Sequence, residues 1–161
     1  KEISADKDVI VETLEKAFDF AGVTKQIHLH SPARFADVLE VENADVLSFE
    51  FAASPKNIES VSKRALEQAD KMVRVGVART DIDAIVSELY DRGIARPDAS
   101  QLVESEETIG KHFAVAKEKY GESLAFAGPD CGLGGWPSQE AARLLLNRTV
   151  SAIRKTVADR A

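Results

Sequence analysis

The sequence has little cysteine, no excess of positive charge and no long apolar run, and each absence restricts what the protein can be. Cys131 is the only cysteine among 161 residues, which excludes an intrachain disulfide and favours a reducing compartment such as the cytoplasm. No apolar run approaches the roughly 18 residues that a membrane-spanning helix needs. The net charge of −6 and the pI near 5.2 argue against a surface for nucleic acid or anionic membranes. We therefore expect a cytoplasmic protein with neither kind of partner.

The remaining composition is ordinary for a globular protein, with 44% apolar and 30% charged residues. A chain of this length is expected to form one domain over residues 1–161, with a substantial core. It begins at Lys1 rather than at methionine, and no signal peptide is recognisable. We expect a processed or incomplete chain.

Four short apolar segments alternate with amphipathic helical patterns. Strands are predicted at 25–30, 44–51, 71–78 and 124–128, and a loop at 95–101. Helices are predicted at 4–20, 33–39, 54–69, 105–119 and 138–159, and one more is capped by Thr80 or Asp81 and runs to Tyr90. This alternation predicts an α/β fold with a parallel sheet and right-handed crossovers. Four such units are half of a TIM-type barrel, which typically needs about 250 residues. A half-barrel leaves open edges, so we expect a missing half, a partner half-barrel or a homo-oligomer.

The most distinctive stretch covers residues 125–139 and reads A-F-A-G-P-D-C-G-L-G-G-W-P-S-Q. The predicted strand ends at Gly128-Pro129, so Cys131 lies on the loop that follows it. His28 and His30 share one face at the end of the first strand, and Glu50 ends the second. Parallel α/β sheets carry their functional groups at these strand ends. Two nitrogen ligands, one oxygen and one sulfur suit tetrahedral zinc.

Each candidate ligand also has an ordinary structural interpretation. Glu50 could pair with Arg79 or Lys71, and Cys131 could be a small buried apolar side chain. Four other residues have more than one interpretation or an ordinary one. Asp130 either hydrogen-bonds a metal-binding histidine or caps the glycine-rich turn, and Ser31 either contacts substrate or caps the next helix. Trp136 is expected to pack in the core, and His112 to lie at the surface or its boundary. The glycines of the loop lack phosphate-loop spacing, which argues against a nucleotide.

These segments resemble the catalytic barrel of the cobalamin-independent methionine synthase family. Residues 128–137 (G-P-D-C-G-L-G-G-W-P) resemble the family's P-D-C-G-L signature, and residues 27–31 (I-H-L-H-S) stand where the family has H-x-C-x-S. Residues 44–51 (A-D-V-L-S-F-E-F) resemble its glutamate-bearing strand. The segments V-G-V-A and V-E-S-E-E-T resemble its seventh strand and the start of the next helix. The resemblance covers residues 8–159 and implies the last four units of a (β/α)8 barrel.

The resemblance implies a zinc site that activates a thiol. By position, His28, Glu50 and Cys131 match three zinc ligands of the family, and His30 stands where the family has its other cysteine. Imidazole is a competent zinc ligand, so a histidine can replace the cysteine. The replacement changes the charge of the four ligands from −3 to −2. The net charge of the ligands together with zinc therefore changes from −1 to zero. A more electrophilic ion lowers the pKa of a thiol but leaves a less nucleophilic thiolate.

Two further departures concern the middle of the chain. The family carries a histidine in Y-D-I-H-S, where this chain reads V-A-R-T-D-I-D. Asp81 or Asp83 could replace that histidine, or cap a helix. The additional helix near residues 82–93 could act as a lid or a contact surface. The first half of the barrel, where the family binds the amino-acid part of its substrate, has no counterpart here.

The resemblance implies a methyltransferase that transfers a methyl group to homocysteine, giving methionine. The donor would be a methylated folate or, as in shorter family members, a corrinoid protein. Asp130 and Ser31 are the candidate catalytic residues beside the four ligands. Two alternatives stay open, namely another zinc-thiol alkyltransferase of the same superfamily, for example with coenzyme M as acceptor, and a half-barrel subunit without turnover.

Overall fold

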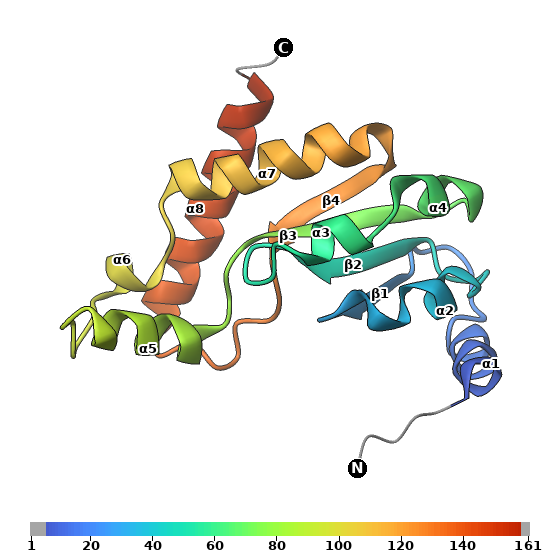
Figure 1. The fold of residues 1–161 in the computed structure, drawn as a ribbon, viewed down its shortest axis with the longest axis horizontal. Coiled ribbons are helices and arrows are strands. Elements are labelled where there is room, and N and C mark those ends of the chain that lie inside the picture. The colour runs from blue at the N-terminus through green and yellow to red at the C-terminus, as the bar shows by residue number, and fades with distance from the viewer. Residues whose placement is uncertain (1–5, 159–161) are drawn as a thin grey trace.

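Four parallel strands form a single sheet, and helical segments follow each strand along the chain (Figure 1). The computed structural model describes residues 6–158. The strands lie side by side in chain order, and every neighbouring pair is parallel. They are β1 (Gln26–Leu29), β2 (Val46–Glu50), β3 (Met72–Ala78) and β4 (Leu124–Pro129). The predicted α/β class and the positions of the strands are confirmed.

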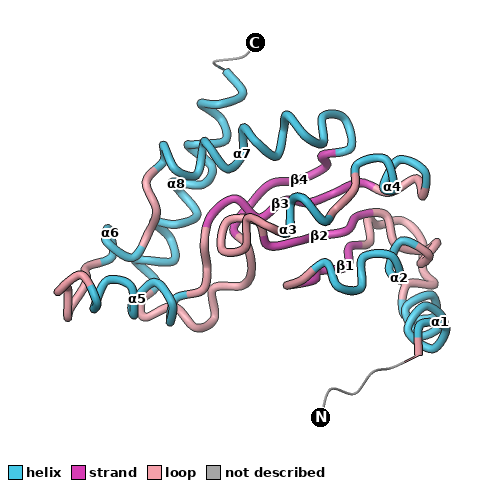
Figure 2. Tube along the Cα trace, in the orientation of Figure 1, coloured by secondary structure: helices cyan, strands magenta, loops and turns pink. Residues whose placement is uncertain are grey.

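Helices occupy much of the rest of the described chain (Figure 2). They are α1 (Lys7–Ala17), η1 (Pro32–Arg34), α2 (Phe35–Leu39), α3 (Asn57–Ser60), α4 (Lys63–Gln68), α5 (Ile82–Asp91), α6 (Ala99–Leu102), α7 (Glu106–Tyr120), η2 (Gly121–Ser123) and α8 (Gln139–Ala158). Figure 1 shows α5 and α6 beyond the strand ends, on the opposite side of the molecule from α1. Within residues 6–158, no helix combines the length and the apolarity that a membrane span requires.

One face of the sheet carries the hydrophobic core, and we call it the covered face. The strand register aligns Leu47 with Val73 and Phe49 with Val75, so these side chains point to the same side. All four are 0% exposed. The ring of Phe49 packs edge-on against Phe35 of η1–α2. Helices α4, α7 and α8 add further apolar side chains to this core.

The opposite face is polar at its centre and exposes apolar side chains, and we call it the open face. By alternation and register it carries Gln26, His28, Val46, Ser48, Glu50, Met72, Arg74, Gly76, Phe126 and Gly128. Met72 is 37% exposed and Phe126 is 52% exposed. All-parallel sheets normally have both faces covered. The open face therefore differs from the covered face in chemistry, and it exposes Met72 and Phe126 although Val46 and Ser48 on it are buried.

The single helix predicted over residues 54–69 was wrong, because the structure has two short helices there. Val61 lies between them in an extended conformation and is completely buried. Its carbonyl accepts a hydrogen bond from the Tyr120 hydroxyl, at 3.2 Å, instead of continuing a helix. Ser62 then caps α4 by accepting from Ala65 N–H. Burial of Val61 and the serine cap together outweigh helical propensity.

Other predicted boundaries also need correction. The loop predicted at 95–101 contains the one-turn helix α6, which a capping box between Asp98 and Gln101 stabilises. The first helix ends at Ala17 rather than at residue 20, and Lys25 Nζ donates to the Phe18 and Phe20 carbonyls beyond it. The predicted start of that helix at Ser4 and the predicted end of the last helix at Asp159 lie outside the described residues.

Candidate metal centre

Four side chains converge where β1, β2 and β4 end, as the sequence predicted. One ligand atom from each of His28, His30, Glu50 and Cys131 lies within 4.8 Å of the others. The histidines come from the end of β1, the glutamate from the end of β2, and the cysteine from the loop after β4. Residues more than 100 positions apart in the chain thus form one compact group at one edge of the sheet. This group is a candidate metal site.

Asn57 holds the ends of β1 and β2 in register at the site. Its Nδ2 donates to the His30 carbonyl at 3.0 Å and to the Glu50 carbonyl at 2.8 Å. One amide group therefore links the backbones that carry two of the candidate ligands. These bonds satisfy carbonyls that lie beyond the regular sheet.

His28 is oriented for ligation by the strand beside it. Its Nδ1 lies 3.0 Å from Ser48 Oγ, and the register pairs these two residues across β1 and β2. Its Nε2 is buried and has no hydrogen-bond partner among the described residues. When Nδ1 donates its proton to Ser48, Nε2 presents a lone pair, which is the arrangement that metal-binding histidines require. The orphaned nitrogen is the feature that best fits a metal ligand.

The pKa of His28 is lowered, which favours the neutral form that binds metals. Burial is the main cause, and the positive charges of His30 and Arg74 lower the pKa further, against the opposing effect of Glu50. An imidazole that stays neutral near pH 7 needs no deprotonation before it coordinates an ion.

Glu50 faces the two histidines rather than Arg79 or Lys71. Its Oε1 lies 2.6 Å from His30 Nδ1 and 4.0 Å from His28 Nε2. The alternative ion pairs considered for Glu50 are therefore wrong. Arg79 pairs with Asp81 and Glu88, and Lys71 donates to the Glu42 and Ala44 carbonyls just before β2 begins, at the opposite end of the sheet.

Cys131 is held at the site by backbone contacts of its loop. Asp130 N–H donates to the Ala78 carbonyl at 2.8 Å, which extends the β3–β4 pairing by one residue. The N–H of Cys131 donates to Thr80 Oγ1 at 3.1 Å. The thiol is half-buried and belongs to no disulfide. Cys131 is thus a candidate ligand at the strand end and not a side chain of the apolar core.

Asp130 has a different structural role from the two that the sequence suggested. Its carboxylate is completely buried and accepts hydrogen bonds from the N–H groups of Phe51, Ala52 and Ala53, so it fixes the loop after β2. It neither bonds a histidine nor caps the glycine-rich turn through any contact found in residues 6–158. Burial raises the pKa of Asp130 to about 6 against the opposing effect of these N–H donors, and the Glu50 charge adds to the rise.

Gly76 makes the position of Asp130 possible. A Cβ at Gly76 would lie 2.0 Å from Asp130 Oδ1 and 2.6 Å from Asp130 Cα, far inside van der Waals contact. The open face therefore needs a residue without a side chain at this point of β3. The catalytic role suggested for Asp130 stays a prediction. In the structure, Asp130 holds the backbone directly after Glu50 and directly precedes Cys131, so it helps to position both side chains.

The remaining sequence candidates have structural positions. Ser31 Oγ accepts from Ala33 N–H and caps η1, which matches the capping interpretation. Trp136 is 9% exposed and belongs to the core. His112 is half-buried, with Nδ1 3.1 Å from the Val77 carbonyl, at the boundary where the sequence placed it. Asp81 stands at the start of α5 without a side-chain cap, because its carboxylate pairs with Arg79.

Sequence reasoning missed three residues that support the site, namely Ser48, Asn57 and Arg74. Arg74 Nη1 donates to Ser48 Oγ at 3.2 Å, so a polar chain runs from His28 through Ser48 to Arg74 across three strands. The sequence contained a pattern that could have identified two of them. Ser48 and Arg74 are polar residues inside otherwise apolar strands, and period-two alternation puts Ser48 on the same face of its strand as Glu50.

The donor set defines which metals the site can hold. Two imidazoles, a carboxylate and a thiolate suit zinc, and imidazole nitrogen also suits copper, iron and nickel. One carboxylate and one thiolate give the group a formal charge that balances a divalent ion. The residues therefore fit a borderline-soft divalent metal rather than calcium or magnesium, which prefer oxygen ligands.

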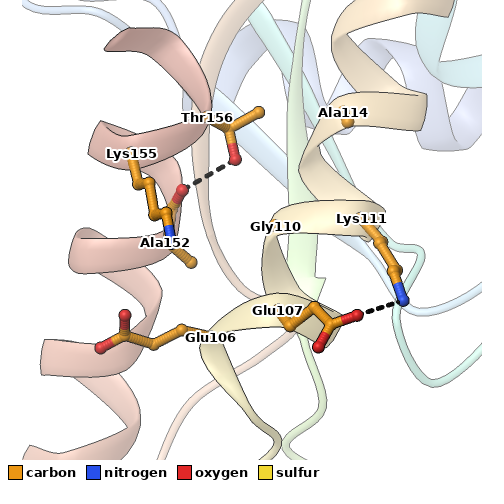
Figure 3. Close-up of a pocket in the computed structure, with 8 residues that line it drawn as sticks. All are labelled: Glu106, Glu107, Gly110, Lys111, Ala114, Ala152, Lys155 and Thr156. Atoms are coloured by element: carbon orange, nitrogen blue, oxygen red, sulfur yellow. Dashed lines mark hydrogen bonds and ion pairs between the residues drawn. The ribbon is translucent and has the colours of Figure 1, made fainter. Parts of the chain in front are cut away.

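Other hollows of the molecule carry no comparable chemistry. Figure 3 shows one between α7 and α8, lined by Glu106, Glu107, Gly110, Lys111, Ala114, Ala152, Lys155 and Thr156. Its Glu107 pairs with Lys111, and Thr156 donates to the Ala152 carbonyl, each within its own helix. The hollow therefore holds one acidic side chain, Glu106, without an ion pair among the described residues, and neither histidine nor cysteine lines it (Figure 3).

No protein-family model, curated protein or solved structure matches this chain. The fold and the candidate site therefore rest on the residues and their geometry.

Proposed function

We propose that the protein is a zinc-dependent methyltransferase that transfers a methyl group to a thiol, with homocysteine as the acceptor. The convergence of His28, His30, Glu50 and Cys131 within 4.8 Å carries this proposal. The resemblance of the Cys131 segment to cobalamin-independent methionine synthases supplies the reaction class. Zinc is the metal proposed, because the donor set and that resemblance agree.

In this proposal the protein's residues provide a metal-binding edge and a rigid frame around it. His28 would bind through Nε2, which Ser48 orients, and Glu50 and Cys131 are fixed by Asn57 and Thr80. A bound zinc ion supplies Lewis acidity that lowers the pKa of a thiol at the site. The acceptor loses its thiol proton, a sulfur–carbon bond forms, and the bond from the methyl group to the donor breaks. The donor is a methylated folate or a corrinoid protein.

We also propose that the sheet is one half of a TIM-type barrel. Strand order β1-β2-β3-β4 with all strands parallel is the order of consecutive barrel strands. The open face would then line the barrel interior, which accounts for the exposure of Met72 and Phe126. The other half would come from a partner half-barrel, a second copy of this chain or further sequence.

Two observations support alternative functions. Histidine at position 30 in place of the family's cysteine leaves another thiol acceptor open, such as coenzyme M. The exposed open face favours a half-barrel subunit that binds metal without turnover. Methyl-transfer assays that compare acceptor thiols with one methyl donor separate these alternatives.

Zinc content per chain is the first test. We expect about one zinc per wild-type chain and a large loss in Cys131→Ser, because one of four ligands is removed. His112→Gln is the matched control, since His112 lies on α7 and outside the ligand group, and it should keep its zinc. Absence of zinc from a well-folded wild type would contradict the proposal, as would equal zinc content in both variants.

A further inference from the structure

Arg74 places a positive charge on the open face beside the candidate metal centre. It points from β3 toward Ser48, the residue that orients His28, and Nη1 lies 3.2 Å from Ser48 Oγ. Nη2 donates to the Pro129 carbonyl at 2.5 Å, and Nη1 has a longer contact of 3.4 Å with the Asp130 carbonyl. The guanidinium therefore lies between the strand that carries Glu50 and the loop that carries Cys131.

The charge of Arg74 has no carboxylate partner within 4.0 Å anywhere in the described part of the chain. All its hydrogen bonds go to neutral oxygens, namely one hydroxyl and two carbonyls. The Asp130 carboxylate is turned away to the backbone of residues 51–53. Arg79 is a useful contrast, since it pairs with two carboxylates, Asp81 and Glu88. Burial lowers the pKa of Arg74, against the opposing charges of Asp130 and Cys131, which marks a cation that lacks full compensation.

The guanidinium and two candidate metal ligands border the same open cavity. This cavity has a volume of about 290 Å³ and is lined by Gln26, His28, Arg74, Asp130, Cys131 and Gly132. The Nε–H of Arg74 has no hydrogen-bond partner among residues 6–158. Gly128 leaves space for the guanidinium, because a Cβ there would lie 3.0 Å from Nη2. A molecule in the cavity can therefore contact His28, Cys131 and the Arg74 guanidinium, which has no acidic partner.

We propose that Arg74 binds the acidic group of the substrate, and that the substrate is a short thiol carrying a carboxylate or a sulfonate. The identity of the substrate as a thiol rests on the proposed function, whereas anion binding by Arg74 rests on the geometry of the open face. A planar guanidinium suits both acids, because it can donate two parallel hydrogen bonds. Arg74 would thereby select acidic thiols over neutral thiols of the same length.

Alkylation of Cys131 tests the anion site without any metal. Iodoacetate and iodoacetamide both form a sulfur–carbon bond with the thiolate and release iodide, but only iodoacetate is an anion. Since Cys131 is the only cysteine, the mass of the whole chelator-treated chain reports its modification. We compare the rate with iodoacetate divided by the rate with iodoacetamide. Both rates depend on the thiolate fraction of Cys131 in the same way, so this ratio does not change when that fraction changes. We expect this ratio to fall about tenfold in Arg74→Gln, the size of one lost charged hydrogen bond.

The matched control is Arg64→Gln, which makes the same charge change at an exposed position of α4, away from the cavity, and should leave the ratio unchanged. An equal ratio in wild type and Arg74→Gln would overturn the proposal and leave Arg74 as a residue that holds the Pro129 backbone. If Arg74→Gln loses the wild-type circular dichroism spectrum, a competition experiment on the wild type replaces it. Propionate should bind Arg74 and slow the alkylation of Cys131 by iodoacetamide, whereas the neutral propionamide should not. Equal effects of propionate and propionamide would overturn the proposal.

Thiol binding to the zinc-loaded protein then identifies the acid. Calorimetry with 3-mercaptopropionate, 2-mercaptoethanesulfonate and 2-mercaptoethanol compares a carboxylate, a sulfonate and a neutral thiol. We expect one acidic thiol to bind about tenfold more tightly than the neutral thiol, and Arg74→Gln to abolish that preference. Zinc binding with no preference for either acid would overturn the Arg74 proposal and leave the proposed function intact. A chain without zinc would contradict the proposed function, while the alkylation ratio would still decide the role of Arg74.

Discussion

The two faces of the sheet are built from the same four strands but differ in chemistry and in the exposure of their aromatic side chains. On the covered face, Phe49 is completely buried between the rings of Phe35 and Phe51. On the open face, Phe126 is 52% exposed beside Arg74. The covered face is apolar at successive alternate positions, whereas the open face carries His28, Ser48 and Arg74 in one row across three strands.

This contrast separates the source of stability from the source of chemistry. Burial of apolar area is the main favourable term in folding, and here it comes from the covered face. The polar row of the open face contributes little apolar burial, but it orients His28 and keeps a cation next to Cys131. Substitutions on the two faces should therefore have different consequences.

The largest expected effect is on stability and comes from a matched pair of phenylalanines. Phe49→Ala should lower the free energy of unfolding by about 3–5 kcal/mol, because it leaves a cavity in the core. Phe126→Ala should change it by only about 0.5 kcal/mol, as expected for an exposed position. Urea denaturation of both variants measures the difference. Similar losses in the two would show that the open face is covered in solution, for example by a second copy of the chain.

A smaller loss of stability is expected at Gly76, near the carboxyl end of β3. Gly76→Ala should cost about 2–3 kcal/mol, because the new methyl group collides with Asp130 and displaces the loop that it holds. The metal affinity should fall as well, since Glu50 directly precedes that loop and Cys131 directly follows Asp130 in the chain. Gly134→Ala is the control, because a Cβ there meets no atom within 4 Å and Gly134 does not line the cavity beside Cys131. Normal stability and metal binding in Gly76→Ala would disprove the role assigned to Asp130.

The smallest expected effect concerns the polar row alone. Ser48→Ala removes the hydroxyl that orients His28, and we expect metal affinity to fall about tenfold, as is usual for residues that support a metal ligand. Ser62→Ala removes a serine that caps α4 and contacts no candidate ligand, so its metal affinity should match the wild type. Competition with a chromophoric zinc chelator measures both affinities. Unchanged affinity in Ser48→Ala would mean that His28 needs no support from β2.

Much of the fold and the candidate ligand set could be predicted from local patterns. Each strand was expected within about two residues of its observed bounds, because short β-branched and apolar runs between helical patterns are strong signals. The site was predictable because parallel strands bring their carboxyl ends to one edge. His28, His30, Glu50 and Cys131 each follow or end a strand, so their convergence required only the strand assignments.

The errors arose where tertiary contacts competed with local preference. The helix expected over 54–69 breaks at Val61, since burying that side chain and bonding its carbonyl to Tyr120 outweighs helix continuation. Glu50 has two basic candidates in the sequence, but the sheet places Lys71 at the far end and gives Arg79 to other acids. The spacing of these residues in the sequence does not indicate how far Lys71 or Arg79 lies from Glu50 in the folded chain.

The sequence alone determined the alternation of strands and helices and which residue types stand at the strand ends. These properties follow from hydrophobic periodicity and turn chemistry, which act over a few residues. Tertiary structure alone decided that Asp130 turns to the backbone of residues 51–53, that Ser48 orients His28, and that Arg74 lacks an acidic partner. Those features depend on the register between strands and on the space left at Gly76 and Gly128, which packing sets over the whole sheet.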